Sequence, residues 1–215
     1  MVPDPFSHLR IDYGDEPLER ASLPVDAFDL CREWLAAAER AGVSEPNGMA
    51  LATCDATGQP HCRIVLCKGV GARGFTFFTN KQSDKGAQLA GNAKAAATFW
   101  WPAPRNRQVR ITGAVEHAAA AEADAYFASR PRRAQLCSAA SPQSRPVADR
   151  DELERRVDAL AAQVGDGPVP RPEHWGGYTL VAAAIEFWQG RTGRLHDRFR
   201  YLRDGGSWRI ARLAP

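Results

Sequence analysis

Five short segments in the first half of the chain constrain its fold more than any other feature. Each is rich in apolar, β-branched or aromatic residues, and the loops between them carry Gly, Asp, Asn or Pro, a pattern that predicts strands joined by turns. They span residues 49–54, 61–67, 75–79, 95–101 and 108–116. Several short strands in succession predict an antiparallel barrel.

Helices are expected around and between these strands. Apolar residues recur at helical spacing within 24–41, and Gly42 follows as a stop. Ser83 is a favourable cap for a helix over 83–90. Further helices are expected over 118–129 and 149–164, and further strands over 178–188, 199–202 and 208–213.

The helices interrupt the strand series without a repeat or a low-complexity linker. We therefore expect one domain over residues 24–215, mainly β with inserted helices, in the α+β class. Residues 1–23 are polar and proline-bearing, and we expect them to form an N-terminal arm.

Charge and cysteine content exclude several classes of protein. A net charge of +3 and the lack of a long basic run argue against nucleic-acid binding. No apolar stretch approaches the roughly 18 residues of a membrane span, and the N-terminus lacks the pattern of a secretory signal. The 5 cysteines form no CxxC pair and no disulfide framework, so we expect no metal site and a cytoplasmic location.

The run from Glu186 to Arg198 is the most informative motif. An apolar segment ends there in a glycine-bounded turn, after which Arg194, His196 and Arg198 alternate. In an extended chain these three side chains share one face, which suits an anionic aromatic ligand. On spacing alone, a solvated polar strand end beside a tight turn is the preferred interpretation.

Together with two further motifs, this run resembles the pyridoxamine 5'-phosphate oxidase family. The other motifs are Arg63-Ile64-Val65-Leu66-Cys67-Lys68 and the C-terminal Arg212-Leu213-Ala214-Pro215, and the resemblance extends from about His8 to Pro215. It implies the FMN-binding split β-barrel, a Greek-key-like antiparallel barrel. It also implies a homodimer with FMN at the subunit interface.

The resemblance implies a set of FMN contacts. The positions of Arg63 and Lys85 hold the flavin phosphate in the family, with Phe78 and Thr79 nearby, and the whole run 63–68 borders the cofactor. Gln108, Trp188 and Arg198 match contacts to the flavin ring. Gln143 and Ser144 match a pair that reaches FMN from the second subunit.

The resemblance also implies a substrate site and two catalytic residues. Lys68, Tyr126 and Arg130 match the clamp on a substrate phosphate, and the last two lie four apart on a predicted helix. Arg194, Leu195 and His196 match the positions over the pyridine ring, where Arg194 and His196 are the expected catalytic residues. Arg10 and Tyr13 match an arm that folds over the substrate.

The chain departs from the family pattern at three places. Asp84 stands where relatives often carry arginine, and Ala134 where they carry a serine hydroxyl. Residues 136–141 replace a common Gly-Ala-Trp run. Cys137, within that stretch, is expected to be an idle thiol because the implied chemistry needs no nucleophile.

The implied activity is oxidation of pyridoxine or pyridoxamine 5'-phosphate by O2 to pyridoxal 5'-phosphate and H2O2. One alternative is a sister flavin oxidase of the phenazine-biosynthesis type, acting on an unphosphorylated aromatic substrate. Tyr126 and Arg130 argue against it, whereas Asp84, Ala134 and the 136–141 run keep it open. A non-catalytic flavin- or haem-binding protein of the same fold is a further alternative, and a ligand-free structural dimer ranks last.

Overall fold

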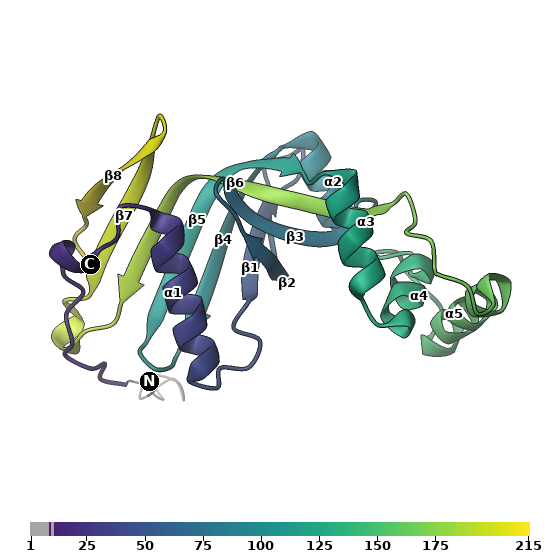
Figure 1. The fold of residues 1–215 in the computed structure, drawn as a ribbon, viewed down its shortest axis with the longest axis horizontal. Helices are drawn as coiled ribbons and strands as arrows, with labels where there is room; N and C mark the ends of the chain where they lie inside the picture. Colours follow the sequence, from purple (N-terminus) through teal and green to yellow (C-terminus); the bar gives the residue numbers. More distant parts are fainter. Residues whose placement is uncertain (1–8, 10) are drawn as a thin grey trace, which may run out of the picture.

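A six-stranded antiparallel barrel forms the centre of the computed structural model, which describes residues 9 and 11–215 (Figure 1). The strand order is β3-β2-β1-β4-β5-β6-β7-β8, and a further pairing of β3 with β6 closes the first six strands. The strands are β1 (Gly48–Cys54), β2 (Pro60–Val70), β3 (Gly74–Asn80), β4 (Lys94–Trp101), β5 (Arg107–His117), β6 (Trp175–Gln189), β7 (Asp197–Asp204) and β8 (Ser207–Arg212).

The helices lie outside the barrel, and Ser83 caps α2 as the sequence predicts, whereas the cap of α1 was not predicted. Asp26 caps α1 by accepting from the Phe28 N–H, and Ser83 caps α2 by accepting from the Gly86 N–H. The helices are α1 (Ala27–Arg40), α2 (Asp84–Gly91), α3 (Ala120–Ser129), α4 (Arg132–Ala140) and α5 (Arg150–Val164), with short 3-10 turns η1 (Arg20–Ser22) and η2 (Thr192–Arg194). Within the described residues no helix is long and apolar enough to cross a membrane.

Strand β6, which has 15 residues, connects the two ends of the sheet. Its first half pairs with β3 and its last residues pair with β7, while β5 follows it on the other edge. At 3.2–3.4 Å per residue, the path along β6 from Trp175 to Trp188 is about 40 Å. The β5–β6 register shifts at Gly113, where a Cβ atom would lie 1.8 Å from the Val181 carbonyl oxygen, so only glycine fits.

Aromatic side chains fill the barrel core, and those of α1 pack against this core. Trp34 of α1 is buried and packs edge-on against Phe187, with ring centroids 5.2 Å apart. Phe28 contacts both Phe75 of β3 and Trp208 of β8. These contacts hold the β7–β8 hairpin, which lies beyond the closed barrel, against the same core.

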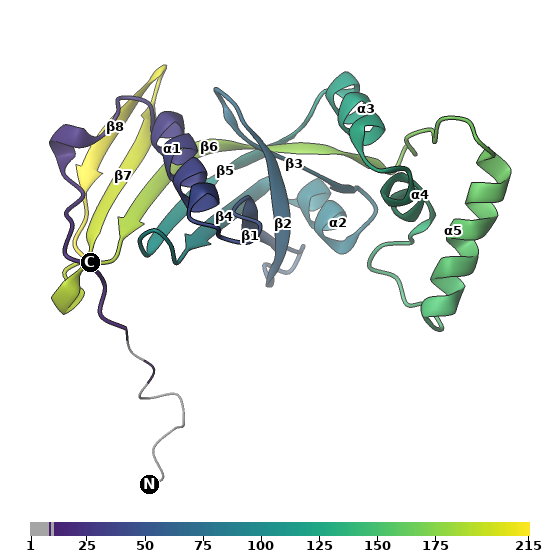
Figure 2. The same cartoon turned by 60° about the horizontal axis from the view of Figure 1, so that its bottom comes forward.

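Helices α3, α4 and α5 form a second small apolar cluster at the far end of the barrel (Figure 2). Phe127, Leu136 and Val157 are buried in it against Trp175 at the start of β6. The Gln135 side-chain amide donates to the carbonyl oxygens of Phe127, Ala128 and Arg130, and so fixes the corner between α3 and α4. This corner positions one half of the site described below.

The structure confirms the expected fold class, mainly β with inserted helices in an antiparallel split barrel. Helix α4 was not predicted, because its sequence carries no clear apolar stripe. The extended path expected through Arg194 is wrong. Gly193 and Arg194 both have φ of 61° and lie in η2, so strict alternation begins only at β7.

Candidate functional site

A cavity of about 550 Å³ opens at the end of the barrel where α3 and α4 meet β2 and β3. We call it the phosphate cavity. Most of the predicted cofactor and substrate residues of this region line it: Ile64, Val65, Leu66, Lys68, Phe78, Thr79, Lys85, Tyr126, Arg130 and Gln143. Asn80, Ala134, Cys137, Ser138, Ser141 and Trp175 complete the wall.

Lys85 forms the cationic base of the phosphate cavity. Its Nζ atom donates to Thr79 Oγ1 at 3.2 Å, Ser83 Oγ at 3.1 Å and Gln143 Oε1 at 2.9 Å. Burial, and secondarily the positive charge of Arg63, lower the pKa of Lys85. Both effects disfavour the charged form of Lys85. The attraction of an anion bound here would offset them.

Arg63 lies beside this base, on the barrel side of it. Its guanidinium donates to the Leu51 carbonyl, to Thr53 Oγ1 at 2.6 Å and to Gln88 Oε1 at 3.0 Å. Within the described chain neither Arg63 nor Lys85 forms an ion pair with a carboxylate. Two partly buried cations that no described carboxylate contacts directly fit a bound dianion such as the phosphate of FMN.

Asp84 does not occupy the anion position. Its carboxylate is exposed and lies 3.7 Å from Arg145, although its negative charge also acts on Arg63 and Lys85. Because Asp84 is the first residue of α2, its negative charge also stabilises the helix by interacting with the positive end of the helix dipole. The departure from the family pattern therefore reduces the positive potential at Arg63 and Lys85 without placing a carboxylate in contact with either.

The predicted substrate clamp lies on the α3 side of the phosphate cavity. The Tyr126 ring stacks on Phe78 with centroids 4.3 Å apart, and Lys68 Nζ lies 5.9 Å from the Tyr126 centroid. The Arg130 guanidinium lies 5.2 Å from the Trp175 ring. Three donors thus face one cavity from two directions, as recognition of a phosphate requires.

Two details of this clamp differ from the sequence prediction. Arg130 is not on the helix, because α3 ends at Ser129 and Arg130 has the extended conformation favoured before proline. Ser138, which was not predicted, lines the cavity one turn after Ala134 and accepts a hydrogen bond of 2.8 Å from Arg130. A serine hydroxyl is therefore present in the clamp despite Ala134, and the i, i+4 spacing on a helix was the available signal.

Some predicted residues of this region lie outside the cavity wall. Cys67 is buried toward the core, donates to the Gly69 carbonyl oxygen, and burial raises its pKa to about 11. Ser144 is exposed with φ of 69° and does not line the cavity. Gln143 accepts a hydrogen bond from Lys85 of its own chain, because the loop after α4 brings it back to α2.

The second group of predicted residues lies at the opposite end of β6. Gln108, Trp188 and Arg198 stand directly opposite one another on β5, β6 and β7, so their side chains share one face. Trp100 on β4 is opposite Gln108 and extends this row, with its ring 6.0 Å from Trp188. We call Gln108, Trp188, Arg194, His196 and Arg198 the ring end of the site.

The backbone of the turn before β7 sets the tautomer of His196. The Arg191 N–H donates to His196 Nδ1 at 3.1 Å, so Nδ1 is an acceptor and the proton resides on Nε2. The imidazole packs against Trp188, with centroids 4.7 Å apart. Burial and the adjacent charge of Arg194 lower the pKa of His196, which keeps it neutral at neutral pH.

We expect this neutral tautomer to be measurable. In an NMR titration, His196 should titrate below the usual value of about 6.5, and Arg194→Ala should raise its pKa because a repelling charge is lost. If the reaction requires neutral His196 with its Nε2–H as a donor, activity should be lost only as the pH falls through this lowered pKa. A His196 pKa above the usual value would contradict the assignment.

The N-terminal arm is attached to the ring end by several polar contacts. Asp15 pairs with Arg191 at 3.0 Å and accepts from Thr192 Oγ1. The Leu18 N–H donates to the buried Asp197 at 2.9 Å.

These contacts bring Tyr13 edge-on to Trp188 and His196, where a Cβ atom on Gly190 would lie 2.7 Å from the Tyr13 ring. Glycine at position 190 is thus required for this approach. Arg10, predicted to join Tyr13, lies outside the described residues.

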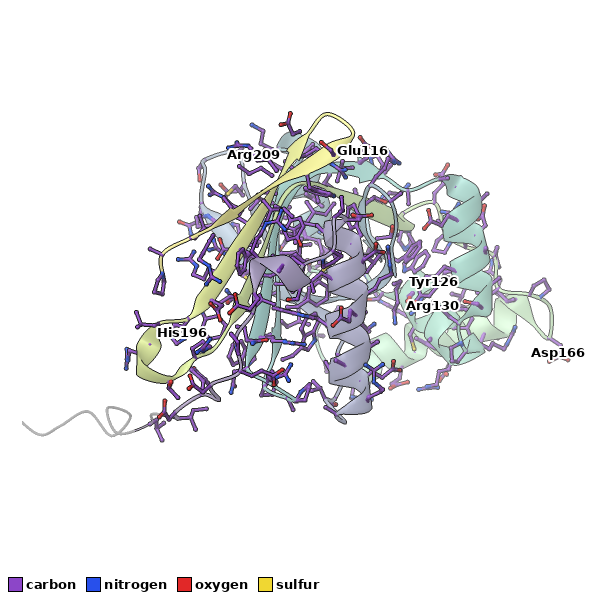
Figure 3. All side chains as sticks on the ribbon, turned by 60° about the vertical axis from the view of Figure 1, so that its left-hand side comes forward. Glu116, Tyr126, Arg130, Asp166, His196 and Arg209 are labelled. Carbon is purple, nitrogen blue, oxygen red and sulfur yellow. The ribbon has the colours of Figure 1, made fainter. Side chains whose placement is uncertain are left out.

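The phosphate cavity and the ring end are far apart in one chain. Figure 3 shows Tyr126 and Arg130 on one side of the molecule and His196 on the other. No residue of the ring end lines the phosphate cavity. The two groups lie at opposite ends of β6, along a strand path of about 40 Å.

The barrel, the unpaired cations and the aromatic row together define an FMN-binding split-barrel oxidoreductase. The pyridoxamine 5'-phosphate oxidase family model matches residues 35–163, and the pyridoxine 5'-phosphate oxidase C-terminal dimerisation region matches residues 175–215. The chain belongs to the pyridoxamine 5'-phosphate oxidase family, whose members are FMN-dependent oxidoreductases.

Individual relatives agree with this assignment. The pyridoxine/pyridoxamine 5'-phosphate oxidase of Pseudomonas paraeruginosa is 52% identical over 98% of both chains. That of Bordetella petrii is 51% identical over 97% of this chain and 99% of its own. The crystal structure of PhzG from Burkholderia lata, in complex with tetrahydrophenazine-1-carboxylic acid, is 31% identical with a TM-score of 0.85, covering 94% of this chain and 100% of that one.

Proposed function

We propose that this protein oxidises pyridoxine 5'-phosphate or pyridoxamine 5'-phosphate with O2, giving pyridoxal 5'-phosphate and H2O2. The observation that carries the proposal is that cationic and donor side chains form two anion positions in and beside one cavity. Lys85 on the cavity wall and Arg63 just outside it form the first, and Lys68, Tyr126 and Arg130 on the wall form the second. A flavin phosphate and a substrate phosphate account for both positions, whereas an unphosphorylated substrate leaves the second without a ligand.

The proposed FMN contacts follow from the same geometry. Lys85, Arg63 and the Thr79 hydroxyl would hold the phosphate, and the row of Gln108, Trp188 and Arg198 would hold the polar edge of the ring. When bound, FMN supplies the two-electron acceptor for the hydride from the substrate C4' carbon and returns the electrons to O2. The five free thiols suit the reducing cytoplasm, where we place the enzyme.

The residues of the ring end orient the substrate in this proposal. His196 presents an Nε2–H donor to the 3-hydroxyl oxygen or the C4' substituent, because its Nδ1 is already engaged by the Arg191 N–H. Arg194 holds the pyridine ring against the flavin. Tyr13, packed against Trp188 and His196, covers this end from the arm. Orientation and exclusion of water are the protein's contributions to the rate.

A complete site needs two copies of the chain in this proposal. The two groups lie at opposite ends of β6, a strand path of about 40 Å, so we place the phosphate cavity of one chain against the ring end of another. The outer face of the sheet between these groups exposes Ile64 and Trp100, which are 67% and 48% exposed. Both features, and the family's C-terminal dimerisation region, support a homodimer with FMN at the interface.

Mixing two inactive variants tests this arrangement. Arg130→Ala damages only the phosphate cavity, and Arg194→Ala damages only the ring end. If subunits exchange freely in an equal mixture, half of the dimers are mixed and each holds one intact site, so about a quarter of wild-type activity should return. No recovery in dimers shown by mass to be mixed would place both groups of one site on one chain.

The substrate is tested by anaerobic spectroscopy of the FMN-loaded protein. Pyridoxine 5'-phosphate should bleach the flavin absorption band, and admission of air should restore it. Unphosphorylated pyridoxine should bleach it far more slowly, since the clamp is then unused. Equal rates for the two compounds would favour an unphosphorylated aromatic substrate of the kind bound by the PhzG structure.

A further inference from the structure

A buried carboxylate, Glu186, directs the guanidinium of Arg198. Glu186 Oε1 accepts from Arg198 Nε at 3.1 Å and from Arg198 Nη2 at 2.8 Å. Arg198 Nη1 donates to the Ala214 carbonyl oxygen at 2.7 Å. A guanidinium has five N–H donors, so these contacts fix its plane and leave two donors for a ligand.

Glu186 also stands among more positive than negative charge. It is 8% exposed, lies directly opposite Arg110 on β5 and Arg200 on β7, and contacts Arg110 at 3.7 Å. Arg200 Nε is buried and has no hydrogen-bond partner among the described residues. One carboxylate therefore contacts two guanidiniums, those of Arg198 and Arg110, and stands opposite a third in the row next to Gln108, Trp188 and Arg198.

This row is part of the surface on which we place the flavin ring. Because strands β5, β6 and β7 are in register, the charged row lies immediately beside the ring contacts and on the same face. A buried glutamate paired with a ligand-binding arginine has a specific physical effect, since it both orients the arginine and reduces the local positive potential.

We propose that Glu186 is a positioning residue for the flavin: it aims Arg198 at the ring and sets the charge that the ring experiences. The inference rests on the proposed function, which brings FMN to Arg198. The negative charge of Glu186 opposes formation of the anionic reduced ring, and Arg110 favours it. The pair therefore tunes the reduction potential of the cofactor in opposite directions.

Two variants test this pair, with FMN affinity and the midpoint potential of bound FMN as readouts. Glu186→Gln keeps the shape and an acceptor oxygen but loses the charge. Its FMN dissociation constant should rise about tenfold, as expected when a charge-assisted hydrogen bond weakens, and its midpoint potential should become more positive.

Arg110→Gln removes the opposite charge from the same pair, and its midpoint potential should become more negative. Arg110 is half-exposed, so this variant should fold even if Glu186→Gln does not. Shifts of the two midpoint potentials in the same direction, or no shift in Arg110→Gln, would overturn the proposal. Purely structural damage would not move the potential in opposite directions when opposite charges are removed.

A matched control separates this outcome from a general effect of removing a carboxylate. Glu116 lies on β5, pairs with Arg73 at 2.7 Å and is outside the charged row, so Glu116→Gln should change neither quantity. Failure of the proposed function is recognised independently, because the wild-type protein would then not be reduced by pyridoxine 5'-phosphate. A wild-type enzyme that is reduced normally, with both variants unchanged in affinity and potential, would overturn only the role of Glu186.

Discussion

Arg194→Ala should lower turnover by about a hundredfold to a thousandfold while leaving FMN content close to that of the wild type, because a misoriented substrate loses the advantage of its bound geometry. Arg194 is exposed and forms no hydrogen bond or ion pair with any described residue. Its removal should therefore cost little folding free energy. Steady-state kinetics with flavin content measured on the same sample gives the comparison.

Arg209→Ala is the matched control for this experiment. Arg209 is an exposed arginine on β8, away from the ring end, and its removal should not change turnover. Unchanged turnover in Arg194→Ala would show that the role assigned to Arg194 is wrong. A large loss of flavin with unchanged turnover per flavin would show that Arg194 contacts the cofactor and not the substrate.

Asp197→Ala should destabilise the protein by about 3–5 kcal/mol, the range seen when one member of a buried ion pair is removed. The Asp197 carboxylate is 5% exposed and accepts from the Leu18 N–H, from Arg212 at 2.5 Å and from Arg191 at 3.3 Å. The variant leaves these donors without an acceptor. Because Leu18 then loses its anchor, the arm should also become accessible to limited proteolysis.

The same carboxylate predicts the direction of the pH dependence. Burial alone would raise the pKa of Asp197, but the Leu18 N–H, Arg212 and Arg191 outweigh it and hold the pKa below 3.8. The unfolded chain therefore binds a proton before the folded one does. The stabilisation is fully present above the unfolded pKa and is lost as the pH falls through the lower, folded value.

Denaturant unfolding at neutral and acidic pH measures both effects, with Asp204→Ala as the control. Asp204 lies at the exposed end of the same strand and should contribute little. Asp15→Ala removes the exposed arm contacts with Arg191 and Thr192, so it should increase proteolysis with a small change in stability. Equal stability of Asp197→Ala and wild type would contradict the anchoring role of Asp197.

Local sequence signals were sufficient for most individual strands and for several helix ends. The segments around Met49, Phe75 and Phe99 form strands because their apolar residues alternate or cluster over lengths too short for helices. Ser83 and Asp149 cap α2 and α5 because a side-chain oxygen satisfies a free N–H wherever the helix begins. Such effects act over a few residues and can be recognised without the rest of the chain.

The sequence by itself determined the class of fold, the family and nearly all of the residue types in the site. Only the tertiary structure decided how they are grouped: Gln143 beside Lys85, Ser138 beside Arg130, and Glu186 behind Arg198. It also divided the site between the two ends of β6. The physical reason is that strand register and the helix corner at Gln135 depend on burial between segments far apart in the chain, which no local pattern specifies.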